Sequence, residues 1–135
     1  MKNWLVFAVI AIGGLIWTAF EEIKDKQLLE PEFPPYYIVD GVTATAYSAP
    51  GDGMPTASGM QPHLGICAVS RGMEKIAPLG SQVFVDNHLF LVADRTNGRF
   101  IDLRVDLYVG EIESVAKEYG IHRGLTVVVI PKEEK

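Results

Sequence analysis

A run of 17 residues from Trp4 to Phe20 carries no charged side chain, and this feature limits the possible folds of the chain more than any other. A helix over this run would be about 25 Å long, close to the ~30 Å hydrocarbon core of a bilayer. Lys2 precedes the run, and the acids Glu21 and Glu22 follow it, so the positive-inside rule places the N-terminus in the cytoplasm. We therefore predict a single-pass membrane anchor over residues 1–20, with the rest of the chain outside the cytoplasm.

Two alternatives to an anchor exist for the same run. A signal peptide would be cleaved after small residues, but the candidate stretch 16–20 places the bulky Trp17 where a small side chain is needed. A buried helix of a soluble domain is disfavoured because the run is apolar on all sides and is followed directly by a polar segment. The uncleaved anchor is the preferred interpretation.

Residues 21–37 combine charged side chains with Pro31, Pro34 and Pro35, a composition that favours an extended stalk over a packed core. The remaining 98 residues, 38–135, are enough for one small domain. Cys67 is the only cysteine, which excludes an internal disulfide. A net charge of −5 argues against nucleic acid as a partner.

Short β-branched and apolar segments separated by turns fill the predicted domain, which indicates a mainly β fold. One helix is expected over 111–119, with Ile112, Val115, Ala116 and Tyr119 on one face, ending at Gly120. Six strands and one short helix in so few residues predict a small closed barrel. The predicted strands are 38–48, 65–70, 81–86, 88–94, 104–109 and 125–130, with a hairpin turn at Asp86-Asn87.

Few side chains in this domain suggest chemistry. The three histidines are scattered without metal-ligand spacing, and we expect no metal and no cofactor. Cys67 lies in an apolar strand, which favours a buried structural thiol over a nucleophile.

Aspartates inside predicted strands are the more informative feature, since strands normally exclude them. Asp94 ends one strand and Asp106 lies within another, with Asp102 between them. In the segment 104–109, alternation places Arg104, Asp106 and Tyr108 on the face opposite the apolar residues. Solvated aspartates paired with nearby arginines are the simple explanation, and a shared polar site is the other.

Several short motifs follow one another over residues 39–130. They are TATAYS (43–48), PTASG (55–59), GICAVS (65–70), APLGSQVFVD (77–86), LVADRTNGRF (91–100), VDLYVG (105–110), AKEYG (116–120) and VVVI (127–130). This succession resembles the three-aspartate (3D) domain family. The resemblance implies a six-stranded double-psi β-barrel and lytic cleavage of peptidoglycan, as in bacterial lytic transglycosylases.

Matched position by position, Asp94 and Asp106 correspond to the second and third aspartates of that family. Ser70 stands where the family has its first aspartate, and Asp102 matches none of the three. An acid that donates a proton near neutral pH needs a raised pKa, which a second carboxylate nearby can provide. We therefore assign Asp106 as the acid/base and Asp94 as its charge partner, although these two roles could be reversed.

Candidate contacts to sugar hydroxyls, in addition to Ser70, are Thr45, Tyr47, Thr56 and Ser58. Thr45 and Tyr47 could equally be surface residues of a strand.

Two functions follow from the resemblance. The first is a membrane-anchored lytic transglycosylase of the bacterial cytoplasmic membrane that cleaves MurNAc-GlcNAc bonds with formation of 1,6-anhydro-MurNAc. The second is a non-catalytic barrel that binds glycan or an envelope protein, because the first aspartate is replaced by Ser70.

Overall fold

A computed structural model describes residues 32–135 of the chain. The predicted anchor (1–20) and most of the predicted stalk lie outside the described residues. Pro34–Lys135 forms one compact unit whose first strand begins at Tyr37, so this unit includes residues 34–37 of the predicted stalk. Residues 32–135 contain no helix with the length and hydrophobicity of a membrane span.

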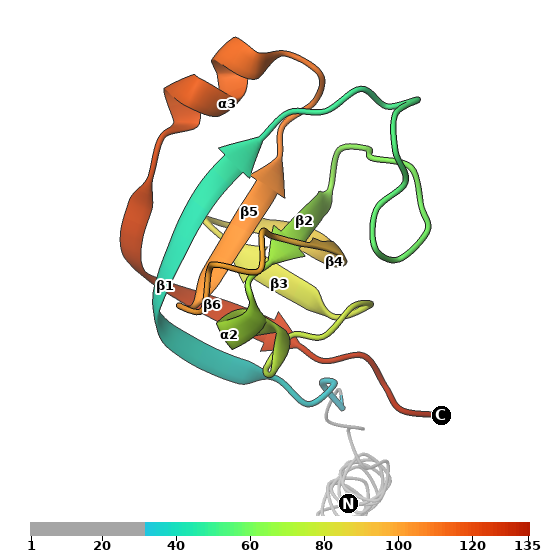
Figure 1. The fold of residues 1–135 in the computed structure, drawn as a ribbon. Helices are drawn as coiled ribbons and strands as arrows, with labels where there is room; N and C mark the ends of the chain where they lie inside the picture. The colour runs from blue at the N-terminus through green and yellow to red at the C-terminus, as the bar shows by residue number, and fades with distance from the viewer. Residues whose placement is uncertain (1–31) are drawn as a thin grey trace, which may run out of the picture. The chain divides into compact units, whose positions relative to one another are not determined.

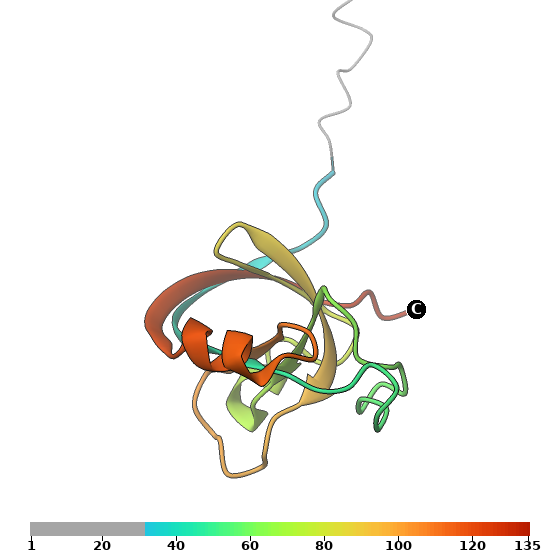
Figure 2. The ribbon, with the colours of Figure 1, turned by 90° about the horizontal axis from the view of Figure 1, so that it is seen from above.

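Six strands close into a barrel, as the sequence pattern predicted (Figure 1). Their order around the barrel is β1-β5-β2-β4-β3-β6. Figure 2 shows the closed barrel from above. The strands are β1 (Tyr37–Tyr47), β2 (Ile66–Val69), β3 (Gln82–Val85), β4 (His88–Arg95), β5 (Arg104–Tyr108) and β6 (His122–Ile130).

Strand pairing is partly parallel, which no local pattern in the sequence indicates. β1 runs parallel to β5, and β2 runs parallel to β4, whereas the other neighbours are antiparallel. The predicted hairpin is confirmed: β3 and β4 are joined by Asp86 and Asn87, whose φ angles of 46° and 64° are the left-handed values of a two-residue turn.

Small aliphatic side chains, mostly valine, fill the barrel interior, where Cys67 is also buried as predicted. Burial raises the pKa of the Cys67 thiol to about 12, so the thiol is neutral at physiological pH. A second, smaller cluster lies around Ile66, Ala93 and Tyr108, packed against Met60 of the long 48–65 segment.

Three local features differ from the sequence-based expectation. A short helix, α2 (Arg71–Glu74), follows β2 and was not predicted. The predicted helix is present as α3 (Glu113–Tyr119) and is capped by Gly120, but it buries none of its residues, and Val115 is 41% exposed. β6 begins three residues before the predicted start because His122 pairs with Ala44 of β1 across a bulge.

Candidate functional site

Four residues from four neighbouring strands form a continuous row across the barrel wall. Thr45 of β1 pairs with Asp106 of β5, Asp106 pairs with Ala68 of β2, and Ala68 pairs with Asp94 of β4. Residues paired across neighbouring strands point to the same face of a sheet. We call this set, Thr45, Asp106, Ala68 and Asp94, the aspartate row.

Alternation along β5 places the aspartate row on the outer face. Val105 and Leu107 are buried in the barrel core, whereas Arg104 and Asp106 are only half-buried. Tyr108 continues the outer face and packs in the second cluster. The predicted division of this segment into an apolar and a polar face is confirmed.

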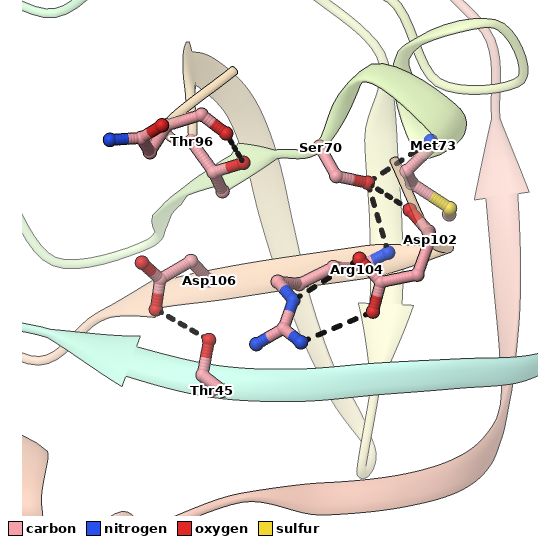
Figure 3. Close-up of polar contacts among 8 residues, drawn as sticks. Thr45, Ser70, Met73, Thr96, Asp102, Arg104 and Asp106 are labelled. Atoms are coloured by element: carbon pink, nitrogen blue, oxygen red, sulfur yellow. Dashed lines mark hydrogen bonds and ion pairs between the residues drawn. The ribbon is translucent and has the colours of Figure 1, made fainter. Parts of the chain in front are cut away.

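Asp106 is held by its neighbour on β1. The Thr45 hydroxyl donates a hydrogen bond of 2.9 Å to Oδ1 of Asp106 (Figure 3). Burial raises the pKa of the Asp106 carboxyl, while the Thr45 hydrogen bond and the positive charge of Arg104 act against this rise. The net effect is a raised pKa, and burial, rather than the second aspartate, is its cause.

Asp94 anchors a turn of the 48–65 segment. Its Oδ1 accepts hydrogen bonds from the backbone N–H of Ala57, at 3.0 Å, and of Arg95, at 2.8 Å. The N–H of Ser58 adds a second link between this turn and β4 by donating to the carbonyl of Ala93. Asp94 therefore fixes the 55–59 turn beside the aspartate row.

Tyr47 lies close to both aspartates. Burial raises the pKa of the Tyr47 phenol, and the negative charges of Asp94 and Asp106 raise it further. Its ring is 5.4 Å from that of Tyr108, and its hydroxyl is buried without a hydrogen-bond partner in the described part of the chain. Tyr47 thus remains neutral and forms an aromatic wall next to the row.

Asp102 differs from the two aspartates of the row because it forms an ion pair. Asp102 forms an ion pair of 3.1 Å with Arg104, as the simple explanation for these aspartates required. Neither Asp94 nor Asp106 takes part in an ion pair within residues 32–135. The explanation by surface pairing therefore holds for Asp102 alone.

Ser70 serves as the N-cap of α2. Its side chain is fully buried, and its Oγ accepts hydrogen bonds from the backbone N–H of Met73 and of Arg104. The hydroxyl donates to the carbonyl of Asp102 at 2.5 Å (Figure 3). Ser70 therefore binds backbone groups and does not face the surface, whereas the sequence suggested a contact with a sugar hydroxyl.

Thr56 and Ser58 lie in the turn that Asp94 anchors. Thr56 is buried, and its hydroxyl donates to the carbonyl of Met60 and contacts the Ser58 hydroxyl at 2.9 Å. Ser58 is exposed. Of these two candidates, Thr56 stabilises the turn and Ser58 is accessible for a contact.

One contribution to the site was missed from the sequence. Ala68 lies between the two aspartates of the row, and only the strand order reveals this. Arg104, which the alternating pattern had already placed on the same face as Asp106, acts on Asp106 from the same strand. An apolar pocket of about 550 Å³ lies elsewhere, between β4 and Tyr119, and contains neither aspartate of the row.

No protein-family model matches this chain, and no curated protein matches it either.

Proposed function

We propose that the chain is a membrane-anchored lytic transglycosylase that cleaves the MurNAc-GlcNAc bonds of peptidoglycan. The observation that supports it best is the pairing of Asp94 and Asp106 with the same residue, Ala68, which directs two carboxylates without ion-pair partners to one face. Asp106 has a raised pKa, as a general acid requires.

The reaction needs one proton-transferring group. Protonated Asp106 gives its proton to the glycosidic oxygen as the bond from that oxygen to C1 of the muramyl sugar breaks. The resulting carboxylate then takes the proton of the C6 hydroxyl, whose oxygen forms the new bond to C1 and closes the 1,6-anhydro ring. Because the nucleophile belongs to the substrate, no water has to be positioned.

Asp94 supplies negative charge on the same face. Strands are about 4.8 Å apart, so the Cα atoms of Asp94 and Asp106 are separated by roughly two strand spacings. At this separation Asp94 stabilises the positive charge that develops on the sugar ring, and it does not exchange protons with Asp106 directly.

The closed barrel with two parallel strand pairs supports the double-psi connectivity implied by the resemblance to the three-aspartate family. The anchor over residues 1–20, and hence a location on the outer side of a bacterial cytoplasmic membrane, rests on the sequence. Glycan strands of peptidoglycan are the proposed partner.

Digestion of purified murein by the full chain in detergent tests this proposal. Mass spectrometry should detect 1,6-anhydro-muropeptides with the unaltered chain and with Asp52→Asn, a matched change in the exposed part of the 48–65 segment. Asp106→Asn should release none while remaining folded. Hydrolysed products with a free reducing end, or equal yields from both variants, would argue against the assigned reaction.

A specific observation also supports a second candidate, a non-catalytic barrel that binds glycan or an envelope protein. The position of the first family aspartate is occupied by Ser70, which is buried and whose hydroxyl is bonded to backbone. Binding of murein without release of any product by the unaltered chain would favour this candidate.

A further inference from the structure

Three arginines gather beside the aspartate row, near the start of β5. The guanidinium carbons of Arg99 and Arg104 lie 4.8 Å and 4.3 Å from the centre of the Phe100 ring. The aromatic ring therefore holds two positive charges close together, by cation–π contact on a single platform.

Arg71 completes this cluster from the first turn of α2. Its guanidinium lies against Gly98, where an added Cβ would come within 3.1 Å of Nη2 of Arg71. Its backbone N–H donates to the carbonyl of Phe100, which ties α2 to the turn carrying Arg99. We call Arg71, Arg99 and Arg104 the arginine cluster.

Charge within the cluster is only partly compensated. Arg104 pairs with Asp102, but Arg71 and Arg99 have no ion-pair partner among residues 32–135. Both are exposed. Such a local excess of positive charge stands out in a chain whose net charge is −5, and planar guanidinium groups are well suited to bind a carboxylate with two hydrogen bonds.

The cluster adjoins the proposed acid. Arg104 and Asp106 extend from the same side of β5 (Figure 3), and two residues along a strand correspond to about 7 Å. Arg104 is close enough to influence the charge state of Asp106. A ligand lying over the aspartate row can thus reach the arginine cluster with a substituent.

We propose that the arginine cluster is a subsite for a carboxylate of the peptide carried by the muramyl sugar. This inference rests on the proposed function. In the proposed reaction the lactyl peptide is attached to the same sugar ring whose C1 reacts, and this places an anionic group near the aspartate row. The cluster would make the site selective for peptide-bearing strands over neutral glycan. Asp102 competes with the substrate carboxylate for Arg104.

Binding measurements with two matched glycans test the subsite. The full chain carrying Asp106→Asn, in detergent, is titrated with a murein tetrasaccharide bearing tripeptides and with the same compound after conversion of its carboxylates to methylamides. The free acid should bind more tightly. Arg71→Gln and Arg99→Gln should each weaken binding of the free acid roughly three- to tenfold and leave binding of the methylamide unchanged.

Further variants separate charge from folding. Lys117→Gln, an equal loss of charge on α3, should change neither affinity, and Asp102→Asn should tighten binding of the free acid by releasing Arg104. Arg99→Lys, which keeps the charge, should retain part of the preference. Thermal melting of each variant identifies any that fails to fold.

Equal affinities for the two glycans, or equal losses from Arg99→Gln and Lys117→Gln, would overturn the subsite. If the chain with intact Asp106 still released anhydro-muropeptides in that case, only the subsite would fail. A clear preference for the free acid without any anhydro product would instead contradict the proposed reaction.

Discussion

Asp94 and Asp106 flank Ala68 on its two neighbouring strands, and their carboxylates therefore leave the barrel on the same face. The two aspartates differ in their surroundings. Asp106 is bonded to one hydroxyl and has a pKa raised by burial, whereas Asp94 accepts two backbone N–H groups and fixes a turn. This difference supports separate roles, with Asp106 transferring the proton and Asp94 supplying charge.

Substitution of the two aspartates should have unequal effects on turnover. Asp106→Asn should abolish release of anhydro-muropeptides because an amide cannot exchange the proton. Asp94→Asn should reduce kcat by roughly 10²–10⁴-fold, since the amide oxygen can still accept the Ala57 and Arg95 N–H groups but the charge is lost. Initial rates of anhydro-product formation measure both effects. A larger loss for Asp94→Asn would exchange the two roles.

The stability of the chain should depend on pH through Asp106. Because the folded pKa is raised, Asp106 contributes stability that is fully present below about pH 4, its unfolded pKa, and is lost as pH rises through the folded pKa. Asp106→Asn has no ionised form, so its melting temperature should exceed that of the unaltered chain at pH 7 and by a smaller margin at pH 4. A variant less stable at both pH values would contradict the burial of this carboxyl.

Removal of the Ser70 hydroxyl should destabilise the fold. Ser70→Ala loses the N-cap of α2 and leaves the Asp102 carbonyl and the Arg104 N–H without this partner, at a cost of about 1–3 kcal/mol. Chemical denaturation measures the change, with the exposed Ser58→Ala as the matched control. Restoring the family residue by Ser70→Asp should also destabilise, because a carboxylate at this buried position cannot donate to the Asp102 carbonyl. Equal stability of Ser70→Ala and Ser58→Ala would remove the structural role assigned to the cap.

A close backbone contact at Gly72 leads to a further prediction about stability. A Cβ at this position would collide with the carbonyl oxygens of Ile101 and Asp102. Gly72→Ala should therefore lower the free energy of unfolding by roughly 1–3 kcal/mol, a typical cost of overpacking. Gly51→Ala, whose added Cβ would have its nearest neighbour at 3.5 Å, should be nearly neutral. Similar stabilities of the two variants would show that the loop over α2 adjusts freely.

The uncharged run at 4–20 predicts the behaviour of the full-length protein in cells. It should sediment with the cytoplasmic membrane at its unprocessed mass, and protease added outside the cytoplasm should reach the barrel. Membrane fractionation followed by intact-mass measurement tests this. A soluble form beginning near Glu21 would support the signal peptide instead, without affecting the barrel.

The local sequence pattern was sufficient to predict the strands, the face that each side chain occupies on β5 and the Asp86-Asn87 hairpin. These features depend on residues close together in the chain: alternation requires only neighbours two apart, and a two-residue turn only the residues that adopt it. For the same reason the buried state of Cys67 followed from the apolar residues around it.

Contacts between distant segments decided the rest. Asp94 and Asp106 are brought together because β2 lies between β4 and β5, an order set by the packing of the whole barrel and by no local signal. Ser70 became a buried cap because the 101–104 segment folds back over α2. Most of α3 stayed exposed, and its last residue, Tyr119, packs against the barrel core. The alternation of apolar and polar residues and the residue types that form a turn are properties of short segments. Strand order is a property of the assembled core, and the arrangement of the candidate site depends on strand order.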